Sequence, residues 1–216
     1  VIVSSGVMWS KESKDGLLYH NDRLIMVDAL GSSEAIGMAT NTTTSDSGGR
    51  TAKFELGPHT RVITDAGKDV VAGSGELGRV AQRGRTPVGY YKDDVKSAQT
   101  FVMIDGDRYS IPGDYATVEA DGTVTLLGRG SQCINTGGEK VYPEEVEECL
   151  KLHPSVADAA VVGLPDDKWG EAINALVELH AHATIDEDEL RSHVKAHLAA
   201  YKAPKAVFPI DSVSRA

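Results

Sequence analysis

The residue pattern changes character twice along this 216-residue chain, which limits its fold more than any other feature. Residues 1–49 hold continuous apolar runs, which are typical of strands covered on both faces. Residues 53–128 hold short alternating runs separated by turns such as Asp105-Gly106. After Arg129 the pattern becomes mixed. The sequence therefore predicts a mixed α/β (α+β) fold with a partial parallel-sheet subdomain, a β-rich barrel-like module and a small C-terminal α/β domain.

Composition excludes several classes of protein. Apolar residues make up 41% of the chain and charged residues 25%, as in ordinary globular proteins, and no apolar run reaches the roughly 18 residues of a membrane-spanning helix. The net charge of −10 repels polyanions, so we expect no nucleic-acid partner. The two cysteines, Cys133 and Cys149, are too few for a disulfide framework, which favours a cytoplasmic location.

The N-terminal segment has a strand–helix–strand pattern. Apolar residues at Val1–Ser4 and Leu24–Val27 predict two strands around a helix at Lys11–Leu18. Because ligands bind parallel sheets beyond the carboxyl ends of their strands, we expect Asp28–Gly37 to lie at a binding edge. The Thr, Ser, Asp and Gly residues of Asn41–Arg50 predict a surface loop.

The C-terminal segment shows two helix starts. Pro143 precedes a run of carboxylates in the first turn of a helix, where the helix macrodipole favours them. Asp186 and Glu189 resemble a capping box at the start of a second helix. Strands are expected near 157–162, 173–179 and 207–210.

Two patterns resemble ligand motifs but have simpler interpretations. Gly73–Gly78 matches G-x-G-x-x-G, but it leads into a strand at Arg79–Gly84 instead of opening a helix, so we interpret it as a turn. His193 and His197 stand four residues apart. Because no third ligand is near in sequence, we interpret them as a helix edge and not as a metal site.

Two segments of small residues could bind a ligand. In Asp28–Glu34, backbone N–H groups and hydroxyls can hold phosphate oxygens, and the Glu34 carboxylate can hold Mg²⁺. The alternative is a Gly-Ser turn with a solvated glutamate. Gly137-Gly138 permits close approach of the backbone to a ligand, and the alternative is a flexible loop before a helix.

Taken in order, five segments resemble motifs of the adenylate-forming superfamily, which contains acyl-CoA synthetases, luciferases and adenylation domains. The fatty-acyl-CoA synthetase branch is the most similar. The matching segments are Ser4–Val7, Leu30–Glu34, Glu76–Tyr91, Tyr109–Asp114 and Gly128–Glu147.

The resemblance implies a two-step ligase of fatty acid metabolism. A carboxylate attacks the α-phosphate of ATP to give an acyl-adenylate and pyrophosphate, and the CoA thiol then displaces AMP. Both steps develop charge on phosphate or carbonyl oxygens, so catalysis depends on placed cations and N–H donors. The implied cofactors and substrates are ATP/AMP, Mg²⁺, CoA and a carboxylic acid, and a homodimer is compatible with the family.

The resemblance also assigns residues by position. Asp28, Ala29 and Leu30 would border the adenine, Ser33 would contact phosphate and Glu34 would hold Mg²⁺. Asp114 and Arg129 would bind the ribose, Ser131 would be the hinge, and Gly137 and Gly138 would approach the pantetheine of CoA. The full nucleotide-binding set is Ser5, Gly6, Asp28, Ala29, Leu30, Gly31, Ser32, Ser33, Asp114 and Arg129.

The sequence departs from the family pattern at several points. Leu30 replaces the usual Tyr, Ser33 replaces Thr, and Ser131 replaces the common hinge Asp or Lys. The phosphate loop and the catalytic lysine have no counterpart in the chain. We therefore expect residues 1–129 (1–49 and the β-rich 50–129) to be the end of the large domain and 130–216 to be the mobile small domain. Alone, the chain should be inactive.

Other functions stay open. The chain could be a non-catalytic module that binds a nucleotide or acyl-CoA, or the longer enzyme could load a carrier protein in place of CoA. The acid could be fatty, steroid-derived or aryl, with the first two favoured.

Overall fold

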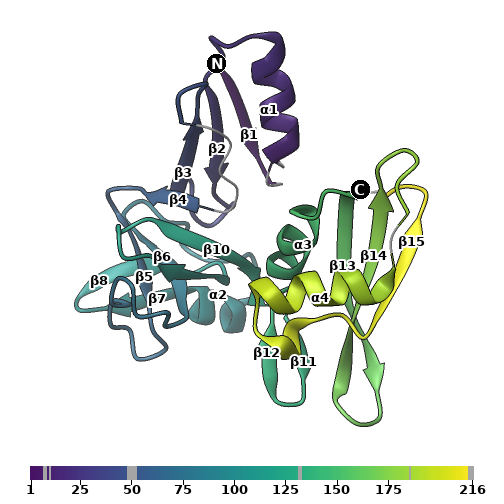
Figure 1. Ribbon diagram of the computed structural model, residues 1–216. Coiled ribbons are helices and arrows are strands. Elements are labelled where there is room, and N and C mark those ends of the chain that lie inside the picture. The colour runs from purple at the N-terminus through teal and green to yellow at the C-terminus, as the bar shows by residue number, and fades with distance from the viewer. Residues whose placement is uncertain (7–8, 10, 48–52, 131–132, 185, 214–216) are drawn as a thin grey trace. The chain divides into compact units, whose positions relative to one another are not determined.

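Two compact units make up the chain. The structure, a computed structural model, describes residues 1–216 apart from 7–8, 10, 48–52, 131–132, 185 and 214–216 (Figure 1). Residues 1–127 form unit 1 and residues 128–216 form unit 2, and each unit has buried hydrophobic clusters of its own. The mixed α/β class predicted from the sequence is confirmed.

Unit 1 contains mostly strands. Its elements, whose last strand ends two residues inside unit 2, are β1 (Ile2–Ser5), α1 (Lys11–His20), β2 (Met26–Leu30), β3 (Ala39–Thr43), β4 (Lys53–Leu56), β5 (Thr60–Ile63), β6 (Gly78–Arg83), α2 (Asp94–Thr100), β7 (Phe101–Ile104), β8 (Asp107–Ser110), β9 (Asp114–Val118) and β10 (Val124–Arg129). Their strand order is β1-β2-β3-β4-β10-β9-β6-β8-β7, with β5 paired to β6. Among the described residues this order is open, so the β-rich module does not close into a barrel.

The strand–helix–strand prediction for the N-terminal segment is confirmed, with two corrections. β1 and β2 are parallel and joined through α1. β2 continues to Leu30, so Asp28 lies inside the strand and not beyond its end. Residues 41–43, predicted to be loop, belong to β3, which pairs antiparallel with β2. The β-branched threonines in this segment suit a strand, and pairing with the free edge of β2 stabilises them in that conformation.

The β-rich module is antiparallel, as predicted. Asp105-Gly106 forms the tight turn between β7 and β8, with φ of +55° and +86°, which suits a two-residue hairpin. The Gly73–Gly78 segment is a turn that leads into β6, as predicted. Helix α2 was not predicted. Its N-cap is Asp93, whose carboxylate accepts from the Lys96 amide at 2.9 Å.

Unit 2 packs two helices over a sheet (Figure 1). Its elements after β10 are β11 (Ile134–Thr136), β12 (Glu139–Val141), α3 (Pro143–Lys151), β13 (Val156–Asp166), β14 (Gly170–Leu179), α4 (Glu187–His197), the 3₁₀ turn η2 (Ala200–Lys202) and β15 (Ala206–Ile210). The strand order is β12-β11-β14-β13, and β15 runs parallel to β14. Leu150 of α3 and Val194 of α4 are fully buried in the core.

Both helix starts in unit 2 are confirmed. Pro143 occupies the first turn of α3. Asp186 caps α4, and its carboxylate accepts from the Asp188 amide at 3.1 Å. Glu189, the second member of the predicted capping box, has its carboxylate 3.5 Å from Nε2 of His153. Among the helices that the structure describes, none is long and apolar enough to span a membrane.

Candidate functional site

The carboxyl ends of β1 and β2 meet at one edge of the unit 1 sheet. The parallel register places Ser5 opposite Ala29, so Ser5 and the following Gly6 lie beside the last residues of β2. Gly6 is exposed with φ of +93°, a conformation that favours glycine. This edge brings Ser5, Gly6, Ala29 and Leu30 together, and its role in binding stays a prediction.

Asp28 forms a buried ion pair at this edge. Its carboxylate lies 2.5 Å from Nζ of Lys14 in α1, and their side chains are 9% and 1% exposed. A buried charge of this kind needs a partner of opposite sign. Asp28 thus joins α1 to β2, and its predicted place beside an adenine stays a prediction.

The Gly31–Glu34 segment forms a turn held by Ser32. The Ser32 hydroxyl accepts from the amides of Glu34 and Ala35, each at 3.2 Å. Its oxygen therefore stabilises the turn, whereas Ser33 is exposed. Of the two serines, Ser33 presents its side chain to solvent, as a phosphate contact requires.

Tyr90 holds the carboxylate of Glu34. The Tyr90 hydroxyl donates to Glu34 Oε1 at 2.5 Å across 56 residues of sequence. The Tyr90 amide donates to Ser97 Oγ at 2.7 Å, and the Tyr90 ring lies 5.6 Å from the ring of Phe101. Ser97 of α2 and Phe101 of β7 thus hold Tyr90, whose hydroxyl orients the predicted magnesium ligand. Tyr90 belongs to a matched motif, but sequence reasoning gave it no role.

Asp114 lies at the start of β9, and it is only 5% exposed. Gly113 before it has φ of +105° and lies in the short break between β8 and β9, which both pair antiparallel with β6 and therefore run in the same direction. Three strands separate β2 from β9 in the strand order. A second set of contacts links the segment after β2 to β9. Gln82 of β6 donates to the Ile36 carbonyl at 2.8 Å, and β6 pairs with β9.

Arg129 and Asp114 belong to different units. Arg129 is exposed at the end of β10, and the prediction that both side chains grip one ribose stays a prediction. Ser131, the predicted hinge, lies outside the described residues.

Gly128, near the end of β10, has φ of +121°, and a Cβ there would lie 2.1 Å from the Glu144 carboxylate of α3. A side chain at Gly128 would require the Glu144 carboxylate to move, and it would strain the backbone at this φ.

Gly137 and Gly138 form the turn of the β11–β12 hairpin, with φ of +60° and +88°. The interpretation as a flexible loop before a helix is therefore wrong. Trp169 lies against this turn: its carbonyl accepts from the Gly137 amide at 2.8 Å, and a Cβ on Gly137 would lie 2.9 Å from its ring. Trp169 is 45% exposed and was missed, because it is 32 residues from Gly137 in sequence.

A second group of reactive side chains lies between α3 and α4. Cys149, His193 and His197 each offer a ligand atom, and these atoms all lie within 4.8 Å of one another. Burial raises the pKa of the Cys149 thiol to about 11, and burial together with His197 and His153 lowers the pKa of His193. The histidine pair is visible in the sequence, whereas Cys149 comes from another helix.

The family match decides where the chain belongs. Residues 145–215 match the AMP-binding enzyme C-terminal domain. Over 99% of its length, the chain is 48% identical to 3-oxocholest-4-en-26-oate–CoA ligase of Rhodococcus rhodochrous. The chain belongs to the adenylate-forming enzymes. It spans 39% of the length of that ligase.

Other adenylate-forming proteins are similar over the whole chain. A medium/long-chain-fatty-acid–CoA/3-oxocholest-4-en-26-oate–CoA ligase of Mycobacterium tuberculosis is 44% identical over 100% of the chain and 39% of its own length. The structure of ATP-bound MatB from Rhodopseudomonas palustris is 26% identical with a TM-score of 0.80, over 99% of this chain and 42% of its own. The amide bond synthetase McbA of Marinactinospora thermotolerans is 28% identical with a TM-score of 0.78, over 98% and 42%.

Proposed function

We propose that this chain is part of an enzyme that joins a carboxylic acid to CoA through an acyl-adenylate, at the expense of ATP. The observation that carries the proposal is the 48% identity to a CoA ligase along almost the whole chain. The buried carboxylate of Asp114 and the hydrogen bond from Tyr90 to Glu34 supply independent support, because buried or tightly held carboxylates are common at functional sites.

We infer a fatty or steroid-derived acid as the substrate. The named substrates of the two relatives are 3-oxocholest-4-en-26-oate and medium- to long-chain fatty acids. ATP, Mg²⁺ and CoA would be the other participants. Both cysteines are free, which suits a reducing compartment such as the cytoplasm.

In this proposal, unit 1 holds the nucleotide. The Asp114 carboxylate accepts hydrogen bonds from the ribose hydroxyls, and a carboxylate suits this because it has only acceptor sites. Ser33 donates to a phosphate oxygen from the exposed side of its turn. The half-buried Glu34 carboxylate is a hard oxygen ligand that fits Mg²⁺, whose charge would screen the phosphates. The family resemblance implies that Arg129, which lies in unit 2, would also donate to the ribose.

Unit 2 would be the small domain that rotates about Ser131 between the two half-reactions. Unit 1 would be the end of the large domain. The turn at Gly137-Gly138 suits the passage of a narrow pantetheine chain, because these residues are exposed and have no side chain. Trp169 beside this turn offers an aromatic face to the same ligand.

A chimera tests the proposal. The chain replaces the homologous 39% of the Rhodococcus ligase, and pyrophosphate release and thioester formation are measured with its named acid. We expect both products to depend on ATP and the acid. A chimera that melts cooperatively, contains its full complement of secondary structure and yet forms no adenylate would overturn the proposal.

The acceptor is tested in the same chimera. CoA and a phosphopantetheinyl carrier protein carry the same thiol arm. A difference between their acyl-transfer rates therefore reports how the enzyme recognises the remainder of each acceptor, which is the nucleotide of CoA or the protein surface of the carrier. We expect CoA to be preferred. Faster transfer to the carrier would assign the enzyme to carrier loading.

Tyr90→Phe should lower kcat of the adenylation step and raise the Mg²⁺ concentration required for half-maximal rate. The substitution removes only the hydroxyl that donates to Glu34, and one hydrogen bond to a charged group contributes about 1.5–3 kcal/mol. Initial rates across a Mg²⁺ titration measure the effect. Tyr91→Phe is the matched control, because Tyr91 is exposed beside Tyr90. Equal Mg²⁺ dependence of the two variants would contradict the positioning role.

Gly137→Ala should slow thioester formation more than adenylation. The added Cβ meets the Trp169 ring at 2.9 Å and occupies a backbone with φ of +60°, so the turn must shift. Single-turnover rates of the two half-reactions, measured separately, test this prediction. Gly138→Ala has a similar φ but open space around the Cβ, so it serves as the control for backbone strain alone.

A further inference from the structure

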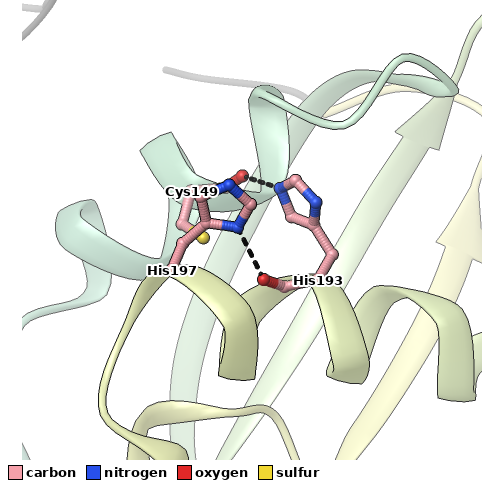
Figure 2. A group of neighbouring side chains, drawn as sticks. All are labelled: Cys149, His193 and His197. Carbon is pink, nitrogen blue, oxygen red and sulfur yellow. Dashed lines mark hydrogen bonds between the residues drawn. The ribbon is translucent and has the colours of Figure 1, made fainter.

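Three side chains from two helices converge at one end of the α3–α4 packing. Cys149 lies in the last turn of α3, and His193 and His197 lie one turn apart on α4, where residues four apart share a helical face. Figure 2 shows the two imidazole rings beside the cysteine. The two rings lie 4.4 Å apart between centroids. The sequence separation of 44 residues between Cys149 and His193 hides this group from pattern analysis.

Backbone carbonyls orient both imidazole rings. His197 Nδ1 lies 2.8 Å from the His193 carbonyl oxygen, so this nitrogen carries the proton in the neutral ring and Nε2 keeps its lone pair. An imidazole that donates to a carbonyl through one nitrogen is the usual arrangement of a metal-binding histidine. His193 Nε2 lies 2.9 Å from the Cys149 carbonyl oxygen (Figure 2), and a cation at this nitrogen would replace that hydrogen bond.

We propose that Cys149, His193 and His197 bind a divalent first-row transition metal, with Zn²⁺ as the preferred ion. A thiolate and two imidazoles are borderline-soft ligands that suit Zn²⁺ better than Mg²⁺ or Ca²⁺. In a tetrahedral zinc site with bonds of about 2.0–2.3 Å, ligand atoms lie about 3.5 Å apart. The three atoms all lie within 4.8 Å of one another, so each pair needs to close by at most about 1.3 Å to reach this spacing.

The site has access to solvent and a structural consequence. His197 is exposed, whereas Cys149 is only 5% exposed, so an ion can enter from the His197 side and keep a water as fourth ligand. The ion would join α3 to α4 within unit 2. Since a ligand that binds only the folded state stabilises it, Zn²⁺ should raise the melting temperature of unit 2. This inference is independent of the proposed ligase activity.

Cobalt and zinc titrations of the 216-residue chain test the site. Co²⁺ is added to the reduced protein, and the near-ultraviolet charge-transfer band of a cobalt–thiolate bond and the visible bands of four-coordinate cobalt are recorded. We expect both to saturate at one equivalent and to disappear when Zn²⁺ is added. Calorimetric titration with Zn²⁺ alone gives the affinity.

Two variants test the ligands Cys149 and His197, and a third is the control. Loss of even an outer-shell partner weakens metal binding by about 10–100-fold, so His197→Gln should weaken Zn²⁺ binding at least about tenfold. Because His197 is exposed, this variant should keep the melting temperature of the metal-free protein. Cys149→Ser should abolish the charge-transfer band. His182→Asn, at an exposed histidine with φ of +67°, is the control and should bind as the wild type does.

Specific outcomes would overturn the proposal. The site is excluded if Co²⁺ gives no thiolate band, or if His197→Gln binds Zn²⁺ as tightly as His182→Asn. It is also excluded if Zn²⁺ leaves the melting temperature of unit 2 unchanged at saturation.

Discussion

Lys14→Met is expected to lower the free energy of unfolding of unit 1 by about 3–5 kcal/mol, because it leaves the buried Asp28 carboxylate without its cation. Methionine keeps the length of the side chain, so the effect reports the lost charge more than lost packing. Restoring neutrality with the double substitution Lys14→Met, Asp28→Leu should recover most of this loss, since well-packed apolar pairs often replace a buried ion pair without cost.

The chain offers a probe and a control for this measurement. Of its two tryptophans, Trp9 lies in unit 1 and Trp169 in unit 2, so the fluorescence of Trp9 in a Trp169→Phe background follows unit 1 through urea unfolding. Lys11→Met removes an exposed i, i+4 ion pair with Asp15 on the same helix. We expect it to change stability by less than about 0.5 kcal/mol. Equal effects at positions 11 and 14 would contradict a buried pair.

Asp114→Asn in the chimera is expected to lower kcat/KM for ATP by about 10²–10⁴-fold. Two hydrogen bonds from ribose hydroxyls to a charged carboxylate contribute about 1.5–3 kcal/mol each, and about 1.4 kcal/mol corresponds to a factor of ten. Steady-state pyrophosphate release measures the loss. Asp105→Asn is the control, because this exposed aspartate has φ of +55°, which asparagine tolerates.

A second measurement separates binding from stability at this buried position. If Asp114 binds the ribose, the wild-type chimera prefers ATP over 2′-deoxy-ATP and the Asn variant loses most of that preference. A variant that melts earlier but keeps the full preference would assign Asp114 to the fold alone.

Local patterns predicted those elements whose signals lie within a few residues. Pro143 and Asp186 mark helix starts in the sequence and in the structure, because capping depends on neighbours along the chain. The turn at Asp105-Gly106 follows from the backbone freedom of the two residues themselves. The family motifs predicted the membership that the matched relatives establish.

Contacts between distant segments explain what the sequence could not predict. The second strand was predicted to end too early, because a charged residue such as Asp28 is unusual inside a buried strand. The buried ion pair with Lys14 makes this position possible. The Tyr90–Glu34 hydrogen bond spans 56 residues, and the third member of the histidine–cysteine group lies on a different helix. Helical and strand periodicity carry no information at such separations.

β10 begins in unit 1 and ends at Arg129, inside unit 2, so the boundary falls within a strand. At Gly128 the strand backbone lies at φ +121°, and a Cβ there would meet the Glu144 carboxylate of α3. A larger residue at this position would strain the end of β10 and displace Glu144 at the same time. The local geometry of unit 2 therefore leaves glycine as the one residue that fits this end of the strand without a rearrangement.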